Sequence, residues 1–509
     1  MWILIGLALA LLGAGAVLVS TSFDKPRKAE PLGRNLPVNE GAGNALDLSA
    51  HNSPSLERNP RNPANLVVAD RVDSPRYSCT LNVSFDGGGN WNQTPIPAPA
   101  REEPKCFAPD VAFGPDGTLY LLFVTLKGRA NAPNAAFLAT SRDGGKTLSE
   151  PIRTPLGKLP FQARLTADPE RPRRLYVTWL KASDVGLYKF TETGNPIMSV
   201  RSENGGRTWT RPMQVSKPTR LRVVAPSPAV GPGGELYVAY LDLGQDRLDY
   251  EGAHRGRGGA PYDGRWQLVV ARSRDRGSSW EESVAEPSVT PSERFIVFTP
   301  PSPSVAVDPA SGRVFTAFQD ARLGDPDVWL RSLPKDSKKW DGAVRVNDTR
   351  RRDRTAQYLP KLAASPDGRL DVVYYDRRGD RTNVLNHTSL QSSYDQGKSF
   401  AGRVRLSDRP FSSRVGFGSE RGMPDLGSRL GLLSTDKRAL AVWTDTRAGT
   451  TKTGKQDLAR RVVAFNDPPR LAGWLEAMLR WGGLLLILLG VAVLVIRGLR
   501  LGPGRAARS

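Results

Sequence analysis

Four short stretches of this sequence place an aspartate beside an arginine at the end of a strand-like run. They are FQDAR with Asp320 and Arg322, YYDRR with Asp376 and Arg377, WTDTR with Asp445 and Arg447, and the pair Asp70-Arg71. A guanidinium group binds a carboxylate through two parallel hydrogen bonds, so Arg322, Arg377 and Arg447 can together hold an acidic ligand. The same spacing also suits ion pairs that tie neighbouring blades together, and both interpretations stay open.

These charges lie on a repeated pattern of strands and turns. Five stretches share serine, then aspartate or asparagine two residues later, then glycine, and end in an aromatic residue or leucine: SFDGGGNW at 84, SRDGGKTL at 141, SENGGRTW at 202, SRDRGSSW at 273 and SYDQGKSF at 393. A degenerate copy, RSLPKDSKKW, ends at Trp340 and divides the longest gap in two. Serine, aspartate and glycine are residues that tight turns require. The spacing of about 60 residues predicts small sheets that pack against their neighbours.

A second kind of turn accompanies these copies. CFAPDVAFGPDGTLYLLFV (106–124) and YLPKLAASPDGRLDVVYYD (358–376) each contain an apolar strand, a turn rich in proline, glycine and aspartate, and a strand rich in valine, tyrosine or phenylalanine. Counting both turns gives seven units of four antiparallel strands. The sequence therefore predicts an all-β chain folded as a seven-bladed β-propeller. Six blades is the alternative, if the sparse first unit is only a lead-in.

The seventh unit lacks a fourth strand. It stops after its third strand, DLARRVVAF (457–465), whereas RNLPVNE (34–40), before the first unit, has the form of a fourth strand. Pairing the two segments would close the ring and remove the exposed edges of an open array. We therefore expect the two ends of the propeller to share one blade.

Both ends of the sequence are apolar. Residues 1–20 carry no charged side chain, so residues 1–22 are typical of a signal peptide or a signal anchor. Residues 481–496 are uncharged between Arg480 and Arg497 and predict a transmembrane helix at 481–498. The predicted organisation continues with a linker (23–34), an extracytoplasmic propeller (35–466), a juxtamembrane segment (467–480) and a basic cytoplasmic tail (499–509).

The composition limits the classes of partner. The formal net charge is +21, and RRRDR (350–354) is the densest basic run. A basic surface favours anionic polymers or lipid head groups, and a solvated arginine-rich loop is the alternative. No nucleic-acid module is recognisable, so no nucleic-acid partner is expected. The two cysteines, Cys79 and Cys106, either form a disulfide between the first two units or stay buried thiols.

Metal chemistry has little support in the sequence. The three histidines are far apart, at His51, His254 and His387. No spacing of cysteine and histidine matches a metal site. We therefore expect neither a metal nor another cofactor.

The Ser-x-Asp-x-Gly turns resemble the Asp-boxes, or BNR repeats, of the sialidase superfamily. The resemblance covers residues 35–465. With its two apolar ends, the whole chain resembles membrane-anchored exo-sialidase-like proteins. In that superfamily these turns are structural and lie on the face away from the ligand, so we assign them no catalytic role. The resemblance implies a membrane-tethered sialidase-like glycoside hydrolase that acts on an acidic, sialic-acid-type glycan. The alternative is a non-catalytic propeller that binds a glycan or a protein at the cell surface.

The resemblance also implies a set of site residues on the opposite face, where the second strands end. Three long insertions belong to that face: 125–134, 181–195 and 242–264. A sialidase needs three convergent arginines, an acid or base aspartate, and a tyrosine nucleophile assisted by a glutamate. Arg322, Arg377 and Arg447 are the candidate arginines, and Asp70 is the candidate acid or base.

Tyr358, in QYLPKLAA, is the candidate nucleophile, with Glu293 or Glu420 as its partner. An aromatic residue packed where a blade begins is the alternative for Tyr358. One feature departs from the superfamily, because the first blade has no Phe-Arg-Ile-Pro stretch. The nearest substitute is Arg58 in LERNPRNP.

Overall fold

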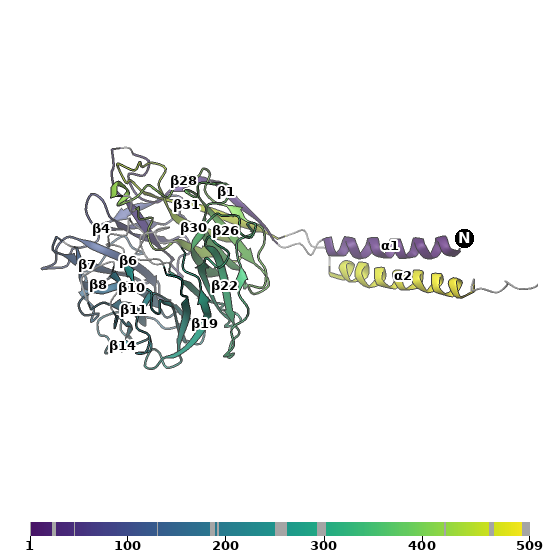
Figure 1. The fold of residues 1–509 in the computed structure, drawn as a ribbon, viewed down its shortest axis with the longest axis horizontal. Coiled ribbons are helices and arrows are strands. Elements are labelled where there is room, and N and C mark those ends of the chain that lie inside the picture. Colours follow the sequence, from purple (N-terminus) through teal and green to yellow (C-terminus); the bar gives the residue numbers. More distant parts are fainter. Residues whose placement is uncertain are drawn as a thin grey trace, which may run out of the picture. The chain divides into compact units, whose positions relative to one another are not determined.

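The computed structural model describes residues 2–22, 27–44, 46–129, 131–183, 189–190, 193–249, 262–292, 302–421, 424–467 and 473–500. The chain divides into two compact units. One unit is Pro31–Val463, and the other combines Met1–Glu30 with Ala464–Ser509. Strands build the first unit and two long helices dominate the second (Figure 1).

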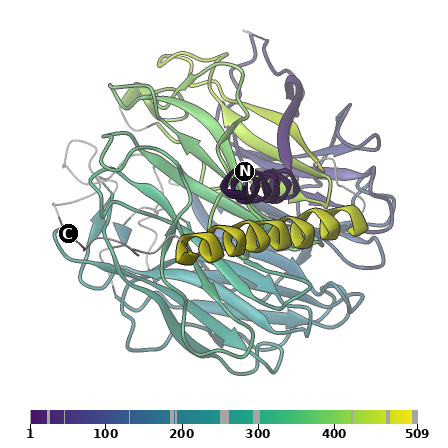
Figure 2. The ribbon, with the colours of Figure 1, turned by 90° about the vertical axis from the view of Figure 1, so that its right-hand side faces the viewer.

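Seven large antiparallel sheets build the larger unit in the part of the chain that the structure describes, and their colours follow the chain around a common centre in Figure 2. The chain is therefore a seven-bladed β-propeller, as the repeats predict. The first blade is a complete sheet, which excludes the six-bladed alternative. Blade one contains β2 (His51–Arg58), β3 (Leu66–Val72), β4 (Ser78–Ser84) and β5 (Asn92–Thr94). Blade two contains β6 (Cys106–Phe113), β7 (Leu119–Lys127), β8 (Ala132–Ser141) and β9 (Ile152–Arg153). Blade three contains β10 (Pro160–Ala167), β11 (Leu175–Lys181), β13 (Ile197–Ser202) and β14 (Met213–Gln214).

The remaining blades follow the same plan. Blade four contains β15 (Val223–Val230), β16 (Leu236–Asp242), β18 (Trp266–Ser273) and β19 (Glu281–Val289), and blade five contains β20 (Ser304–Val307), β21 (Val314–Asp320), β22 (Asp327–Leu333) and β23 (Val344–Arg345). Blade six contains β24 (Gln357–Ala364), β25 (Leu370–Asp376), β26 (Leu385–Ser393) and β27 (Val404–Arg405). Blade seven contains β29 (Gly431–Ser434), β30 (Arg438–Asp445), β31 (Asp457–Asn466) and β1 (Lys28–Pro37). The short elements outside this plan are β28 (Phe411–Ser412), which pairs with β26, and the 3-10 turn η1 (Ser419–Arg421).

The last blade closes the ring with the first strand of the chain. Its strand order is β29-β30-β31-β1, so the predicted fourth strand near residues 34–40 is confirmed, although it begins earlier, at Lys28. Asn35 fastens this strand to blade six, because its backbone N–H donates to Asp408 Oδ2 at 2.7 Å and its side-chain amide donates to Leu406 O at 2.7 Å. Closure satisfies backbone groups that an open propeller would leave exposed.

The second strand of each blade carries the apolar residues that pack between blades. Every residue of β3, β21 and β25 is buried, because neighbouring blades cover both faces of these strands. Cys79 and Cys106 form a disulfide that joins β4 of blade one to β6 of blade two. The blade interfaces thus depend on apolar packing, with one covalent link.

Each Ser-x-Asp-x-Gly turn is held by its own side chains. Ser84 Oγ donates to Asp86 Oδ1 at 2.8 Å and accepts from the Gly88 N–H at 2.9 Å. The serine-to-glycine contact recurs in the turns that begin at Ser141, Ser202, Ser273 and Ser393. The glycine has a positive φ, 90° at Gly88, which side chains larger than hydrogen disfavour. The repeated sequence thus specifies one turn geometry.

The predicted insertions 181–195 and 242–264 meet each other. β12 (Lys189–Phe190) pairs with β17 (Leu248–Asp249) in a separate two-stranded sheet. Much of both insertions lies outside the described residues, including His254. The pairing nevertheless confirms that these two insertions lie on the same face of the propeller.

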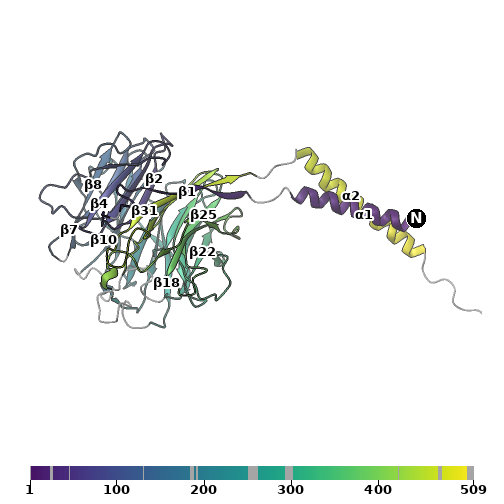
Figure 3. The same cartoon turned by 90° about the horizontal axis from the view of Figure 1, so that it is seen from above.

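The second unit contains α1 (Trp2–Ser22) and α2 (Gly473–Arg500), which lie side by side in Figures 1 and 3. By length and composition, Ala477–Ile496 within α2 is suited to cross a membrane, and Ile3–Leu18 is a shorter apolar stretch within α1. The helices observed at both ends agree with the apolar segments that the sequence predicts there.

Candidate functional site

A cavity of about 130 Å³ lies where the first strands of all seven blades meet. Because every blade contributes its first strand to the lining, these strands are the innermost ones and the cavity lies on the axis of the propeller. One equivalent position in each blade faces it. These seven residues, the axial ring, are Ser55, Asp110, Arg164, Ser227, Ser304, Lys361 and Gly431.

A bulge in the first strand aims the ring residue at the axis. The strand register shifts directly before Ser55, Asp110, Arg164, Ser227 and Lys361. In each case the residue two positions earlier has a positive φ without being glycine; Leu359, for example, has φ 53°. Such backbone conformations cost energy and persist where the surrounding structure holds them in place, often at functional sites.

Some ring side chains tie neighbouring blades together. Ser55 Oγ donates to Asp110 Oδ1 at 2.6 Å and accepts from the Val111 N–H at 3.2 Å. Asp110 Oδ2 accepts from the Leu165 N–H of the next blade at 2.8 Å. The remaining Asp110 contact is with Arg429, whose Nη1 lies 3.0 Å from Asp110 Oδ1. The hydrogen-bonding capacity of Asp110 is therefore largely used by the protein.

Arg164 and Lys361 are different, because neither side chain forms a hydrogen bond or an ion pair with any residue in the described ranges. Both side chains are half-buried at the cavity. Burial lowers the pKa of Arg164 and of Lys361, since the charged forms lose hydration there. Two cationic side chains without a hydrogen-bond partner in one cavity are suited to bind an anionic ligand.

Glu57 lies two residues after Ser55 in β2 and lines the same cavity. Burial, with a smaller contribution from the neighbouring Asp110, raises the pKa of Glu57 to about 7 against the opposing effect of Lys361. The carboxyl group therefore changes its protonation near neutral pH. A group of this kind in a cavity can give or take a proton at physiological pH.

Arg429, from blade seven, is a further charged residue of the cavity lining. Its guanidinium donates to Ser53 O at 2.9 Å and to Pro109 O, as well as to Asp110. Burial lowers the pKa of Arg429 to about 9, and the nearby Arg164 acts in the same direction. Blades four and five provide a neutral wall of serines and prolines, including Ser227 and Ser304. The cavity is therefore lined by charged residues of both signs on one side and by uncharged residues on the other.

The predicted nucleophile, Tyr358, lies elsewhere and is fully buried. Its hydroxyl donates to Asn386 Oδ1 at 2.9 Å and accepts from Arg377 Nη2 at 3.2 Å, and the Arg377 guanidinium stacks on its ring at 4.8 Å. The structure thus brings together Tyr358 and Arg377. Asn386, rather than a glutamate, is the acceptor for Tyr358, and burial raises the pKa of the tyrosine.

The other two predicted arginines pair with the aspartates of their own blades, and Arg322 also pairs with Glu286 of blade four. Arg322 Nη2 lies 2.5 Å from Asp320 Oδ2 and 2.9 Å from Glu286 Oε2. Arg447 forms a bidentate pair with Asp445 at 2.5 and 2.9 Å. The ion-pair interpretation of the Asp-x-Arg stretches therefore describes these two arginines. Their guanidinium groups contact neither Tyr358 nor Arg377 in the ranges that the structure describes.

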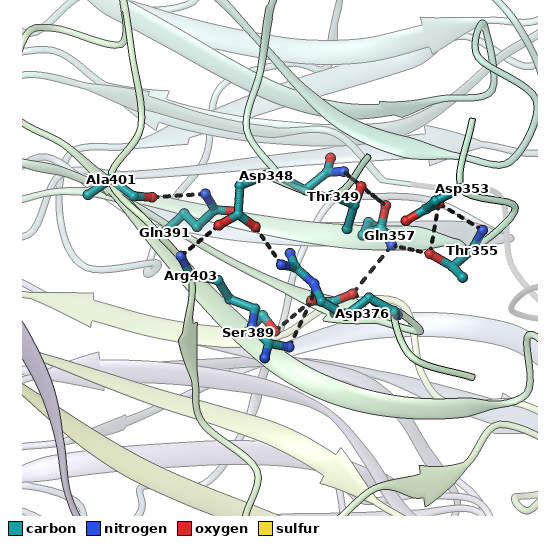
Figure 4. A network of polar contacts seen from close by, with 12 residues as sticks. Asp348, Thr349, Asp353, Thr355, Gln357, Asp376, Ser389, Gln391, Ala401 and Arg403 are labelled. Carbon is teal, nitrogen blue, oxygen red and sulfur yellow. Dashed lines mark hydrogen bonds and ion pairs between the residues drawn. The ribbon is translucent and has the colours of Figure 1, made fainter. Parts of the chain in front are cut away.

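Asp376 belongs to a network that links three strands of blade six (Figure 4). Its Oδ2 accepts from Arg378 Nε at 2.6 Å and from Ser389 Oγ at 2.9 Å, and its Oδ1 accepts from Gln357 Nε2. The partner of Asp376 is thus Arg378 and not the adjacent Arg377. The network fixes the end of β25 and leaves this carboxylate fully occupied.

The remaining predicted site residues do not gather around Tyr358. Asp70 is buried between His51 Nδ1, at 2.7 Å, and Asn82 Nδ2, at 2.8 Å. Glu420 is exposed in η1, and Glu293 lies outside the described residues. A partly buried Arg58 ends β2. Among the residues that the structure describes, no cluster of histidine, cysteine, aspartate and glutamate suits a metal ion.

The sequence contains a signal for the axial ring that the motif analysis missed. In five blades the ring residue directly follows a proline near the start of the first strand, as in Ser53-Pro54-Ser55, Ala108-Pro109-Asp110 and Leu359-Pro360-Lys361. Aligning these X-Pro-X triplets across the repeats places Asp110 and Lys361 at one position. Blade three has alanine in place of the proline, so Arg164 can be assigned to the axial ring only from the pairing of β10 with β11.

Comparisons with known proteins give no sequence family, because no family model and no curated protein matches this chain. Solved structures do match. A protein of unknown function from Dyadobacter fermentans is 15% identical, with 86% of this chain and 99% of that chain covered and a TM-score of 0.48. An ulvan lyase is 13% identical (84% and 98% covered, TM-score 0.46), and the NanB sialidase of Streptococcus pneumoniae is 10% identical (84% and 70% covered, TM-score 0.40). The chain described here is a seven-bladed β-propeller with a charged axial cavity.

Proposed function

We propose that this protein is a membrane-tethered, sialidase-like propeller that binds the acidic end of a glycan in its axial cavity. The observation that carries the proposal is the pair of unpartnered cations, Arg164 and Lys361, in one cavity. An arginine and a lysine aimed at one space can neutralise a sugar carboxylate, with the arginine supplying bidentate hydrogen bonds. The Ser-x-Asp-x-Gly turns support the relationship to sialidases.

The size of the cavity favours recognition of a terminal group. Pockets that enclose a drug-sized ligand measure about 300–1,000 Å³. The axial cavity, at about 130 Å³, is smaller than that. It therefore suits a carboxylate and the atoms next to it, while the rest of the glycan stays outside. A sialic-acid-type sugar at the end of a glycan has this arrangement.

Binding of an acidic sugar and of its neutral ester to the full-length protein in detergent tests this proposal. We expect N-acetylneuraminic acid to bind, and its neutral methyl ester to bind at least about tenfold more weakly. Removing one charged hydrogen-bond donor costs about 1.5–3 kcal/mol, so Arg164→Gln and Lys361→Gln should each weaken binding about ten- to hundredfold. Arg211→Gln is the control, because Arg211 is exposed. Equal binding of the acid and its ester would contradict the proposal.

Hydrolysis of the glycan is the second candidate function, and Glu57 is the observation that favours it. A carboxyl group with a pKa of about 7 can protonate a leaving group at neutral pH. Tyr358, predicted from the sequence as the nucleophile, lies buried beside Asn386 and does not line this cavity, so a hydrolysis with Glu57 as the acid takes its nucleophile from water.

Turnover of a fluorogenic sialoside separates the two candidates. If Glu57 is the acid, Glu57→Gln should lower kcat by about 100-fold or more while the affinity for sialic acid persists. Binding without turnover in the wild-type protein would leave the non-catalytic function. Turnover that is unchanged in Glu57→Gln would exclude Glu57 as the acid.

A further inference from the structure

The two long helices approach each other through glycine. A Cβ atom added to Gly13 would lie 2.4 Å from Gly483 O, and one added to Gly490 would lie 2.5 Å from Gly6 O. Because Gly6 faces Gly490 and Gly13 faces Gly483, the helices run antiparallel. The backbones are thus so close that a side chain at any of these contacts requires the helices to move slightly apart.

These four glycines are also the buried residues of the pair. Among the residues whose exposure the structure describes in α1 and α2, only Gly6, Gly13, Gly483 and Gly490 are fully buried. In each helix the two glycines are seven residues apart, which is two turns and places them on one face. Contacts between small residues bring helices together in membranes, where close packing replaces the hydrophobic effect.

The outer faces of both helices are apolar and exposed. Leu4 and Leu11 of α1 are 71% and 70% exposed, and Leu485 and Leu488 of α2 are 60% and 66% exposed. α1 has 21 residues and no charged side chain. At 1.5 Å per residue it is about 31 Å long, which matches the ~30 Å hydrocarbon core of a bilayer. Both outer faces are therefore suited to contact lipid.

We infer that α1 is retained in the mature protein as a second transmembrane helix and pairs with α2 as an antiparallel hairpin. A cleaved signal peptide has no need of a close glycine contact with a distant segment of the same chain. The hairpin carries the chain through the membrane twice. The propeller then lies on one side of the membrane, and the residues before α1 and after α2 lie on the other.

Two observations assign the sides. Arg497 and Arg500 end α2, and Arg505 and Arg508 follow in the sequence, so the tail is rich in arginine and belongs in the cytoplasm. The disulfide between Cys79 and Cys106 places the propeller in an oxidising compartment, outside the cytoplasm. Lys25, Arg27 and Lys28 fall on the propeller side, where a long domain outweighs a short basic cluster.

Engineered disulfides in the full-length chain test the pairing. A Cβ built on Gly483 lies 3.2 Å from Ala16 Cβ, and one built on Gly490 lies 3.0 Å from Ala10 Cβ. Cβ atoms in disulfides are about 3.5–4.5 Å apart, so small shifts suffice. We expect Ala16→Cys with Gly483→Cys, and Ala10→Cys with Gly490→Cys, to cross-link within one chain in native membranes. Ala16→Cys with Gly482→Cys is the control, because a side chain at Gly482 meets nothing within 4 Å.

Intact mass and peptide mass spectrometry of membrane-extracted protein give the result. Retention of residues 2–22 together with a cross-link in either test pair, and none in the control, supports the hairpin. A wild-type chain that begins after residue 22 overturns the retention of α1. Retention without a cross-link in both test pairs, or equal cross-linking in the control, overturns the pairing. The native cysteines do not compete, because they are joined to each other.

Discussion

At the scale of the residue, Glu57 makes ligand binding depend on pH. Burial raises its pKa to about 7, so the group is neutral below that pH and negative above it. An added negative charge beside Lys361 opposes an anionic ligand, whose own carboxylate stays ionised throughout this range. We expect the affinity for sialic acid to fall as the pH rises from 6 to 8. Calorimetric titration at several pH values checks this, and Glu57→Gln should abolish the dependence.

Tyr358 has a structural environment that its sequence position does not reveal. The hydroxyl bridges Asn386 and Arg377 in a fully buried site. Tyr358→Phe leaves those two groups without one of their partners and should cost about 1–2 kcal/mol in the free energy of unfolding. Urea denaturation measures that loss, and sialic acid binding should stay within a few-fold of the wild-type value. A variant that loses turnover but keeps its stability would instead support the tyrosine as the nucleophile.

At the scale of the element, the repeated turn packs one blade against the preceding one. A Cβ on Gly206, in blade three, would lie 2.1 Å from Leu138 Cδ2, in blade two. Gly157 is the matched control, because its φ of 80° resembles the 86° of Gly206 but its surroundings are open. Gly206→Ala should therefore lower the free energy of unfolding by about 1–3 kcal/mol more than Gly157→Ala. Equal losses in urea denaturation would show that only backbone strain matters at Gly206.

The turns and strands were predictable because they depend on local sequence. Serine, aspartate and glycine specify the turn, and runs rich in valine, tyrosine and phenylalanine specify the strands, so seven blades follow from counting. The axial site depends instead on bulges that rotate Arg164 and Lys361 towards the centre. The Asp-x-Arg stretches were misleading for a related reason. Arg322 and Arg447 pair with their own neighbouring aspartates, so their charges are neutralised before any ligand binds.

At the scale of the whole molecule, ring closure creates the site. No single blade contains it: Glu57, Arg164 and Lys361 come from blades one, three and six. β1, the first strand of the propeller, completes blade seven by pairing with β31, the last strand. Blade seven in turn contributes Arg429, which contacts Ser53 and Asp110. The axial cavity therefore exists only in the closed propeller.

The most direct test of the central claim is a crystal structure of the protein with N-acetylneuraminic acid. We predict that the sugar carboxylate lies in the axial cavity, within hydrogen-bonding distance of Arg164 and Lys361. A carboxylate bound instead at Arg322, Arg377 or Arg447, with the axial cavity unchanged, would contradict it.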